Sequence, residues 1–249
     1  MRDNEDIICG RNAVPEAIRS GNAVDKVLIL EGKHDGPTNT IIREAKKKRI
    51  IIDFTSKTIL DSMCEEKKHQ GVIAYVSPYE YSSVEDILDK AYSKSEDPFI
   101  IILDEIEDPH NLGAIIRTAN LCGAHGVIIP ERRAARLTSV VANTSAGALN
   151  YTPVAKVTNI SKTIQNLKDK GMWFVCGDMD GDTMYNLDLT GPIGLVIGNE
   201  GSGVSPNVKK NCDFIASIPM YGDIDSLNAS VSCGVLSYEI VRQRINKAK

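Results

Sequence analysis

Apolar runs alternate with amphipathic segments through the second part of the chain. Residues 99–103 (Phe-Ile-Ile-Ile-Leu) are continuously apolar, which is typical of a strand buried on both faces of a sheet. The pattern predicts further strands at 127–129, 154–157, 172–176, 193–197 and 214–218, and helices at 113–122, 137–149, 160–170 and 230–246. Strands and helices that alternate over about 150 residues predict a mostly parallel sheet covered on both faces.

The first part of the chain alternates in the same way over shorter segments. Its predicted helices are 12–19, 40–49 and 57–66, and its predicted strands are 26–30, 50–54 and 71–76. We therefore expect a small α/β domain over residues 1–77, a polar linker with one short helix over 78–97, and a larger domain over 98–249.

Composition narrows the class of protein. The 249 residues are 42% hydrophobic and 25% charged, as in ordinary globular proteins, and the net charge of -4 argues against a basic coat for nucleic acid. A local basic patch stays possible, and the run 43–49 is either a solvated helix face or an edge that contacts phosphates.

The six cysteines and four histidines are scattered, so we expect reduced buried thiols and no metal site. The chain starts with polar residues and has no apolar run of about 18 residues, so we expect a cytoplasmic protein without a membrane segment.

Three polar clusters follow predicted strands. The run 193–197 breaks into Gly-Asn-Glu-Gly-Ser-Gly at 198–203, the run 214–218 leads into Pro219-Met220 and Ser226-Leu227-Asn228, and residues 104–113 follow the first strand. Glycine permits a close approach to the backbone, and ligands bind at the carboxyl ends of parallel strands. The phosphate-loop motifs are absent, and Glu200 favours a ligand that carries positive charge or offers hydrogen-bond donors.

Together the clusters resemble a known family. Asp108-Pro109-His110-Asn111-Leu112-Gly113 with Arg117, the 197–203 segment, and Ile218-Pro219-Met220 with 226–231 are similar to the three motifs of the SpoU (TrmH-like) RNA 2′-O-ribose methyltransferases. Residues 9–14 and 69–72 resemble the substrate-binding domain of the RlmB-like branch, which modifies a guanosine of large-subunit (23S) ribosomal RNA.

The resemblance implies a fold, a cofactor and partners. The fold would be a deep trefoil knot in a mostly parallel sheet, after a small RNA-binding domain of ribosomal-protein-like fold. The enzyme would transfer a methyl group from S-adenosylmethionine to a ribose 2′-hydroxyl of ribosomal RNA, without a metal, as a homodimer formed through the knotted domain.

The resemblance also implies site residues. The implied catalytic residues are Asn111, Arg117, Glu200, Ser226 and Asn228. The implied cofactor-binding residues are Ile197, Gly198, Asn199, Gly201, Ile218, Met220, Leu227 and Asn228. We expect Arg132, Arg133 and Arg136 to contact the RNA backbone.

Plainer interpretations stay open at this point. Asn111, Ser226 and Asn228 have the side chains of helix caps, Glu200 could pair with an arginine, and Arg117 could be a surface charge. By resemblance Arg117 accepts the proton or holds a phosphate, in its own pocket or its partner's. Arg132, Arg133 and Arg136 could form a plain solvated patch.

The rival functions are a Rossmann-type methyltransferase, a non-catalytic RNA-binding protein of ribosome assembly, and the same chemistry on another rRNA or tRNA nucleotide.

Overall fold

The structure is a computed structural model that describes residues 7–20, 23–64, 68–77, 79–224 and 226–247. The chain forms two compact units. The first comprises the chain up to Glu80 together with Arg136–Ser139, and the second comprises Tyr81–Ala135 and Val140–Lys249.

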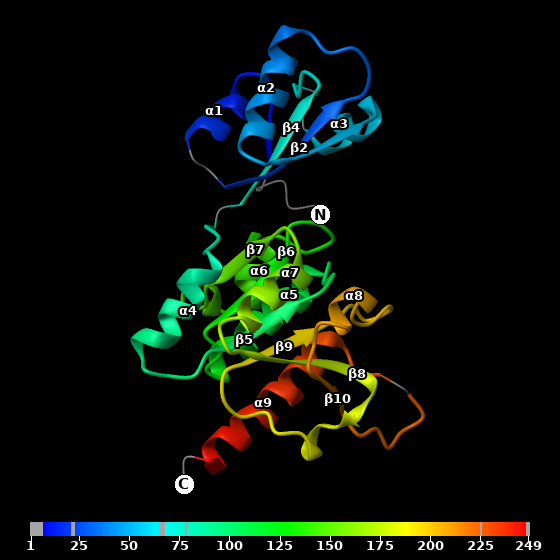
Figure 1. Cartoon of the computed structure of the whole chain (residues 1–249). Coiled ribbons are helices and arrows are strands. Elements are labelled where there is room, and N and C mark those ends of the chain that lie inside the picture. The colour runs from blue at the N-terminus through cyan, green and yellow to red at the C-terminus, as the bar shows by residue number, and fades with distance from the viewer. Residues whose placement is uncertain (1–6, 21–22, 65–67, 78, 225, 248–249) are drawn as a thin grey trace. The chain divides into compact units, whose positions relative to one another are not determined.

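The first unit is a four-stranded sheet with three helices (Figure 1). The strands lie in the order β1-β4-β2-β3, and β2 is parallel to β3 but antiparallel to β4. They span β1 (Ile7–Cys9), β2 (Ala23–Leu30), β3 (Ile51–Thr55) and β4 (Val72–Ser77), and the helices span α1 (Ala13–Ser20), α2 (Gly36–Lys47) and α3 (Lys57–Met63). The pattern did not predict β1, because three residues are too few for a recognisable period.

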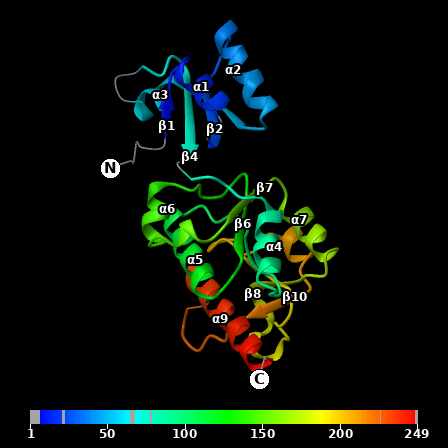
Figure 2. The same cartoon turned by 90° about the vertical axis from the view of Figure 1, so that its left-hand side faces the viewer.

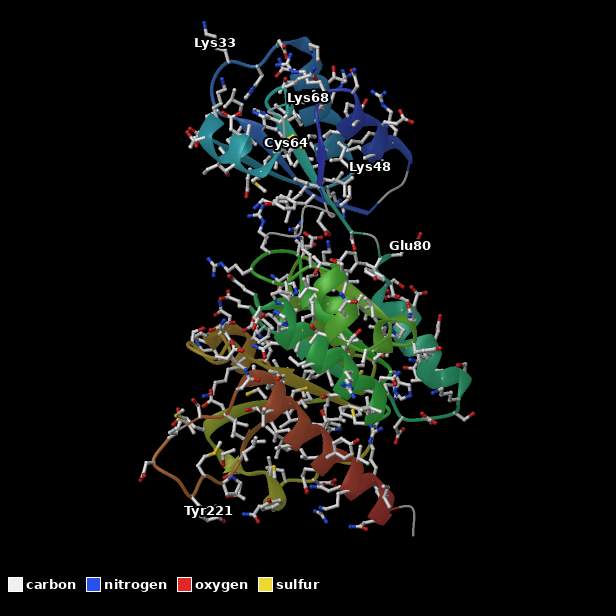
Figure 3. The ribbon with its side chains drawn as sticks, turned by 180° about the vertical axis from the view of Figure 1, so that it is seen from behind. Lys33, Lys48, Cys64, Lys68, Glu80 and Tyr221 are labelled. Carbon is white, nitrogen blue, oxygen red and sulfur yellow. The ribbon has the colours of Figure 1, made fainter. Side chains whose placement is uncertain are left out.

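Alternate residues of β2 fill two separate cores in this unit. Val27 and Ile29 pack against α1 and α2, whereas Leu28 packs against Leu60 of α3 and Cys64. The helix α2 begins four residues before its predicted start, because Asp35 caps it by accepting a hydrogen bond from the Thr38 backbone N at 3.1 Å. Figure 3 shows Cys64 within this unit and Lys33 projecting from its surface.

The second unit contains a six-stranded sheet in which every neighbouring pair is parallel. The order is β10-β8-β9-β5-β6-β7. The strands span β5 (Phe99–Leu103), β6 (Gly126–Pro130), β7 (Val154–Val157), β8 (Trp173–Thr183), β9 (Ile193–Ile197) and β10 (Phe214–Ser217). The predicted α/β class with a mostly parallel sheet is confirmed.

Helices cover both faces of this sheet (Figure 2). On one face, α4 (Val84–Ser93), α7 (Ile160–Lys168) and α8 (Pro206–Lys209) pack on a core that includes Ile100 and Ile102. On the other, α5 (Pro109–Leu121) packs beside α9 (Ala229–Lys247), and α6 (Ser139–Thr144) is a short additional helix. The sheet is therefore held between two helical layers, as the alternation predicts.

In the second unit, two predicted helices differ clearly from their bounds in the structure. The helix α5 begins at Pro109 rather than at residue 113, since Asp108 caps it by accepting from the His110 backbone N at 2.8 Å. The predicted helix 137–149 ends at Thr144, because Ala146 and Gly147 adopt positive φ angles of 51° and 86°.

One strand is longer than the pattern predicts. The strand β8 runs on to Thr183, seven residues beyond its predicted end at Cys176. Its register with β10 shifts between Ile215 and Ala216. The added length carries polar residues, so hydrophobic periodicity does not reveal it.

The described residues hold neither a membrane-spanning helix nor a cluster of metal ligands. None of the helices in these ranges is long and apolar enough to cross a membrane. The same residues contain no group of three or more His, Cys, Asp or Glu side chains placed to hold a metal ion. The six cysteines are free thiols, and Cys9 and Cys212 are the two that are partly exposed.

Candidate active site

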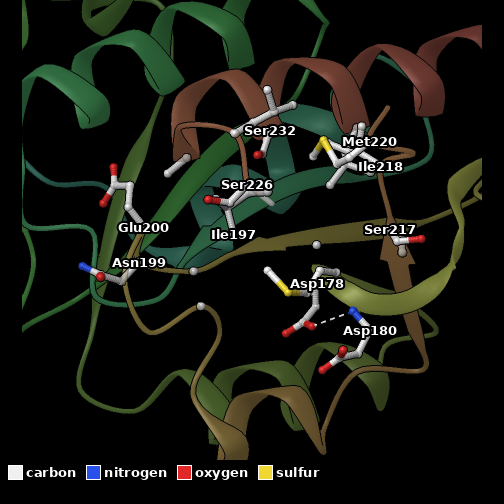
Figure 4. A pocket seen from close by; sticks show the side chains of 18 of the residues that line it. Asp178, Asp180, Ile197, Asn199, Glu200, Ser217, Ile218, Met220, Ser226 and Ser232 are labelled. Carbon is white, nitrogen blue, oxygen red and sulfur yellow. Dashed lines mark hydrogen bonds between the residues drawn. The ribbon is translucent and has the colours of Figure 1, made fainter. Parts of the chain in front are cut away.

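A cavity of about 730 Å³ opens at the carboxyl ends of β9 and β10, beside the middle of β8 (Figure 4). Its walls come from the segments 177–180, 197–203 and 216–220, together with Ser226, Leu227, Ala229, Ser232 and Leu236. Both loops that the sequence pattern singled out therefore line one pocket. Seven of the implied cofactor-binding residues line it: Ile197, Gly198, Asn199, Gly201, Ile218, Met220 and Leu227.

The loop after β9 is closed by its own backbone. Asn199 N donates to Gly203 O at 3.1 Å, and Gly203 N donates to Asn199 O at 2.9 Å. A Cβ atom at Gly198 would lie 2.2 Å from the Gly203 carbonyl carbon, so a side chain at residue 198 cannot fit. The requirement for glycine here is a close approach of two backbone segments.

Residues that follow β5 anchor this loop. Ser205 N donates to Asp104 Oδ2 at 2.7 Å, and Asn199 Nδ2 donates to Glu105 O at 3.0 Å. Asp104 is buried, with 5% of its surface exposed. Since a buried carboxylate needs hydrogen-bond donors, this contact holds the end of the loop firmly.

Three of the implied catalytic residues form a hydrogen-bonded chain. Asn228 Nδ2 donates to Asn111 Oδ1 at 3.0 Å, and Asn111 Nδ2 donates to Glu200 Oε1. Asn111 is buried inside α5 and Asn228 immediately precedes α9, so the chain joins three segments that are far apart in sequence. The side chains of all three motifs therefore lie together beside the cavity.

The plainer interpretations of these residues have different outcomes. Asn111 is not the cap of α5, because Asp108 has that place. Asn228 does cap α9, since its Oδ1 accepts from Ser230 N at 2.9 Å, while its amide nitrogen still reaches Asn111. Among the described residues, Glu200 contacts no arginine. Ser226 lines the cavity (Figure 4).

Arg117 lies apart from this cavity. It is exposed on α5, does not line the cavity, and forms no hydrogen bond or ion pair within the described ranges. Its guanidinium is therefore available to another molecule.

The three arginines near residue 134 are not equivalent. Arg133 pairs with Glu105 at 2.8 Å, Arg136 lies 3.8 Å from the ring centre of Tyr75 within the first unit, and Arg132 is exposed. The interaction with Glu105 raises the pKa of Arg133, first through the hydrogen bond and then through charge. They do not form one free basic patch.

Sequence reasoning missed the segment 177–180 of the cavity wall. Asp178 forms an ion pair with Lys209 of α8 at 2.9 Å. Burial acts to raise the pKa of Asp178, but hydrogen bonds from Lys209 and from Asp180 N outweigh it, so the pKa is lowered. An available signal was the break after Cys176 into Gly-Asp-Met-Asp, which repeats the strand-end pattern of the other two loops.

Comparison with known proteins identifies this arrangement. Residues 98–238 match the model of the SpoU rRNA Methylase family, and residues 7–82 match the model for RNA 2′-O ribose methyltransferase substrate binding. The chain belongs to the SpoU methylase family. YacO of Bacillus subtilis (strain 168), assigned to the TrmH family of tRNA/rRNA methyltransferases, is 44% identical over 98% of each chain.

Solved structures agree with this membership. The SpoU methyltransferase AviRb of Streptomyces viridochromogenes, solved in complex with the cofactor AdoMet, is 27% identical and has a TM-score of 0.60 over 96% of this chain and 90% of its own. The TrmH/SpoU tRNA modifying enzyme of A. aeolicus is 29% identical, with a TM-score of 0.57 over 66% of this chain and 81% of its own.

This SpoU-family protein is an S-adenosylmethionine-dependent RNA 2′-O-ribose methyltransferase. Membership also implies the trefoil knot of the family fold in the second unit. The cavity fits the cofactor chemically. The described lining contains apolar side chains, three carboxylates and no lysine or arginine, as suits a cofactor without a phosphate.

Proposed function

We propose that this enzyme methylates the ribose of a guanosine in large-subunit ribosomal RNA. The support lies in residues 9–14 and 69–72, which resemble the substrate-binding domain of the RlmB-like branch, within a segment that matches a substrate-binding family model. The relatives named above include a tRNA modifying enzyme, so tRNA is the competing substrate.

One observation carries the assignment of the reacting groups, namely the hydrogen-bonded chain from Asn228 through Asn111 to Glu200. S-adenosylmethionine, when bound, supplies a methyl group already activated by its sulfonium. The Glu200 carboxylate has one oxygen held by Asn111, which leaves the other free to accept a hydrogen bond from the ribose. Asn111 is thus a positioning residue, and Glu200 orients the hydroxyl toward the cavity.

Binding of the cofactor rests on both loops. Gly198, Ile218 and Leu227 line the cavity, where their backbone groups would bind the cofactor, and Ile197 and Met220 supply apolar surface. Ser226 adds a hydroxyl to the same wall. These groups suit the adenosine portion of the cofactor, which combines a flat apolar ring with hydrogen-bonding edges.

Arg117 acts on the RNA in this proposal. A guanidinium holds a phosphate through two parallel hydrogen bonds, and Arg117 is exposed and has no competing partner among the described residues. Because its side chain lies outside the cavity of its own subunit, we assign it to the cavity of a second subunit.

The neighbouring helices α5 and α9 provide a surface for such pairing. Leu121 of α5 is 65% exposed. Along α9, Val231, Tyr238 and Ile245 are about half exposed and recur every seven residues, which places them on one side of the helix. A homodimer through these helices would cover this apolar surface.

The first unit would bind a part of the RNA other than the nucleotide that is methylated. Lys33 and Lys68 lie on this unit (Figure 3) and provide positive charge for phosphates. In the second unit Arg132 is exposed and suited to the same role, whereas Arg133 would first have to leave Glu105.

The test is transfer of labelled methyl from S-adenosylmethionine to large-subunit ribosomal RNA that lacks the modification, followed by mapping of 2′-O-methyl positions. We expect label on one guanosine ribose. Label on a different nucleotide, or on tRNA alone, would refute the proposed target while leaving the enzyme class intact.

A further inference from the structure

The charges around the cavity do not balance. Asp178, Asp180 and Glu200 line it, and within the described ranges no lysine or arginine does. Lys209, which does not line the cavity, neutralises Asp178 through their 2.9 Å ion pair. Glu200 contacts the neutral amide of Asn111. At least one carboxylate therefore faces the ligand without a counter-charge.

Asp180 is the least compensated of the three carboxylates. Its side chain forms no ion pair or hydrogen bond within the described ranges, and Lys209 is bonded to Asp178 instead. The pKa of Lys209 is raised mainly by its hydrogen bond to Asp178, and the charge of Asp180 adds less. Figure 4 places both aspartates at one side of the cavity, with a dashed line from Asp180 N to Asp178.

The backbone fixes the position of Asp180. Its N–H donates to Asp178 Oδ1 at 3.1 Å. At the next residue, a Cβ atom on Gly181 would lie 2.4 Å from Ile215 O, so the strand is pressed directly against β10. The backbone that carries the Asp180 side chain is therefore fixed beside the cavity, so its carboxylate stays close to a bound ligand.

We propose that Asp180 makes the cavity select the cationic methyl donor over its neutral product. S-adenosylmethionine carries a positive sulfonium that S-adenosylhomocysteine lacks, and the two molecules are otherwise the same apart from the methyl group. Transfer moves the methyl to the ribose oxygen, leaves the bonding electron pair on a neutral thioether, and releases the hydroxyl proton to water. A carboxylate at the cavity wall therefore attracts the donor, and this attraction disappears once the methyl has been transferred.

The expected effect follows from Coulomb's law. Asp180 is exposed, so the effective dielectric constant is close to that of bulk water. A single charge pair at close range then changes the affinity for the donor by about three- to tenfold. Since the group is exposed, added salt should reduce the effect.

Calorimetric binding to the full-length protein without RNA tests the idea. Asp180→Asn has nearly the same shape and no charge. We expect it to lower the affinity for S-adenosylmethionine by about three- to tenfold and the affinity for S-adenosylhomocysteine by less than about twofold. Asp182→Asn is the matched control, since Asp182 is exposed on the same strand but does not line the cavity, and it should change neither affinity.

A third ligand separates the charge from the methyl group. An analogue with a protonated amine in place of the sulfonium should bind Asp180→Asn more weakly than the wild type, by about the same factor as S-adenosylmethionine does. Equal weakening of donor and product would overturn the proposal, because it would mean that Asp180 binds the α-amino group that both share. Unchanged binding of the donor would overturn it as well. Neither result depends on which RNA nucleotide is methylated.

Discussion

Replacement of Gly198 by alanine should open the loop that closes one side of the cofactor cavity. The added Cβ would lie 2.2 Å from the Gly203 carbonyl carbon and 2.3 Å from Val204 N, where ordinary contacts begin at 3.4 Å. Both neighbours are backbone atoms, so no side-chain rotation relieves the overlap. The two segments must separate by about 1 Å, as in other overpacked sites.

That separation breaks the two backbone hydrogen bonds between Asn199 and Gly203. A typical hydrogen bond contributes about 0.5–1.5 kcal/mol, so the free energy that stabilises the closed loop falls by about 1–3 kcal/mol. If the cavity requires the closed loop, the same amount is lost from the free energy of cofactor binding, which corresponds to an affinity about 5- to 150-fold lower.

Calorimetric titration with S-adenosylmethionine measures this loss, and thermal unfolding checks that the variant folds. Gly222→Ala is the control, because nothing lies within 4 Å of a Cβ at residue 222, which also lies outside the cavity lining. It should bind like the wild type. If Gly198→Ala binds the cofactor within about twofold of the wild type, the closed loop is not required for binding, and this reasoning is wrong.

Four further changes test other parts of the site. Arg117→Ala should lower methylation at least about 100-fold while cofactor affinity stays unchanged; mixing it with Gly198→Ala should restore activity in an assay of heterodimers, and no recovery would place Arg117 in its own subunit's cavity. Deletion of residues 1–77 should leave a folded, cofactor-binding protein that does not methylate RNA, and full methyl transfer by this truncation would refute the proposed role of the first unit. Asn228→Asp keeps the cap of α9 but cannot donate a hydrogen bond to Asn111. The free energy of unfolding, measured by chemical denaturation, should therefore change by less than about 0.5 kcal/mol while the rate of methyl transfer falls, and a normal rate would contradict the proposed hydrogen-bonded chain. The folded-state pKa of Asp178 is lowered, so its contribution to stability is present above the ordinary carboxyl range near pH 4 and is lost as pH falls through the lowered value; acid unfolding of Asp178→Asn should therefore be less steep, and an identical profile would show that the pair with Lys209 does not stabilise the fold.

The apolar pattern predicted the central strands accurately for a physical reason. Strands β5 and β9 are buried along their whole length, so each of their positions must be apolar or small, and the predicted bounds 99–103 and 193–197 match the structure. The start of α5 was misplaced because periodicity begins only after Asn111. Asp108 and Pro109, a cap and a first-turn proline, were the better signal.

The order of the strands depends on pairing between segments that are distant in sequence, and the hydrophobic pattern does not reveal that pairing. The order β10-β8-β9-β5-β6-β7 puts the last strand at the outer edge beside β8, and nothing local in the sequence specifies that neighbour. The polar end of β8 was missed for the same reason: it is a strand because β10 pairs with it, with Asp182 opposite Ala216 and Thr183 opposite Ser217. Asp178 and Asp180 lie between the two paired stretches, where the register shifts, and there they line the cavity.

The hydrogen-bonded chain at the cavity explains why local interpretations of its members compete with functional ones. Asn228 immediately precedes α9 and accepts the hydrogen bond of an ordinary helix cap, so its local environment alone gives no reason to assign it another role. Its second contact, to Asn111, exists only because α9 packs beside α5. The capping bond to Ser230 N fixes the orientation of the Asn228 amide, and that orientation aims its N–H at Asn111. The cap is therefore not an alternative to the functional role, since it is the interaction that places the amide where that role requires it.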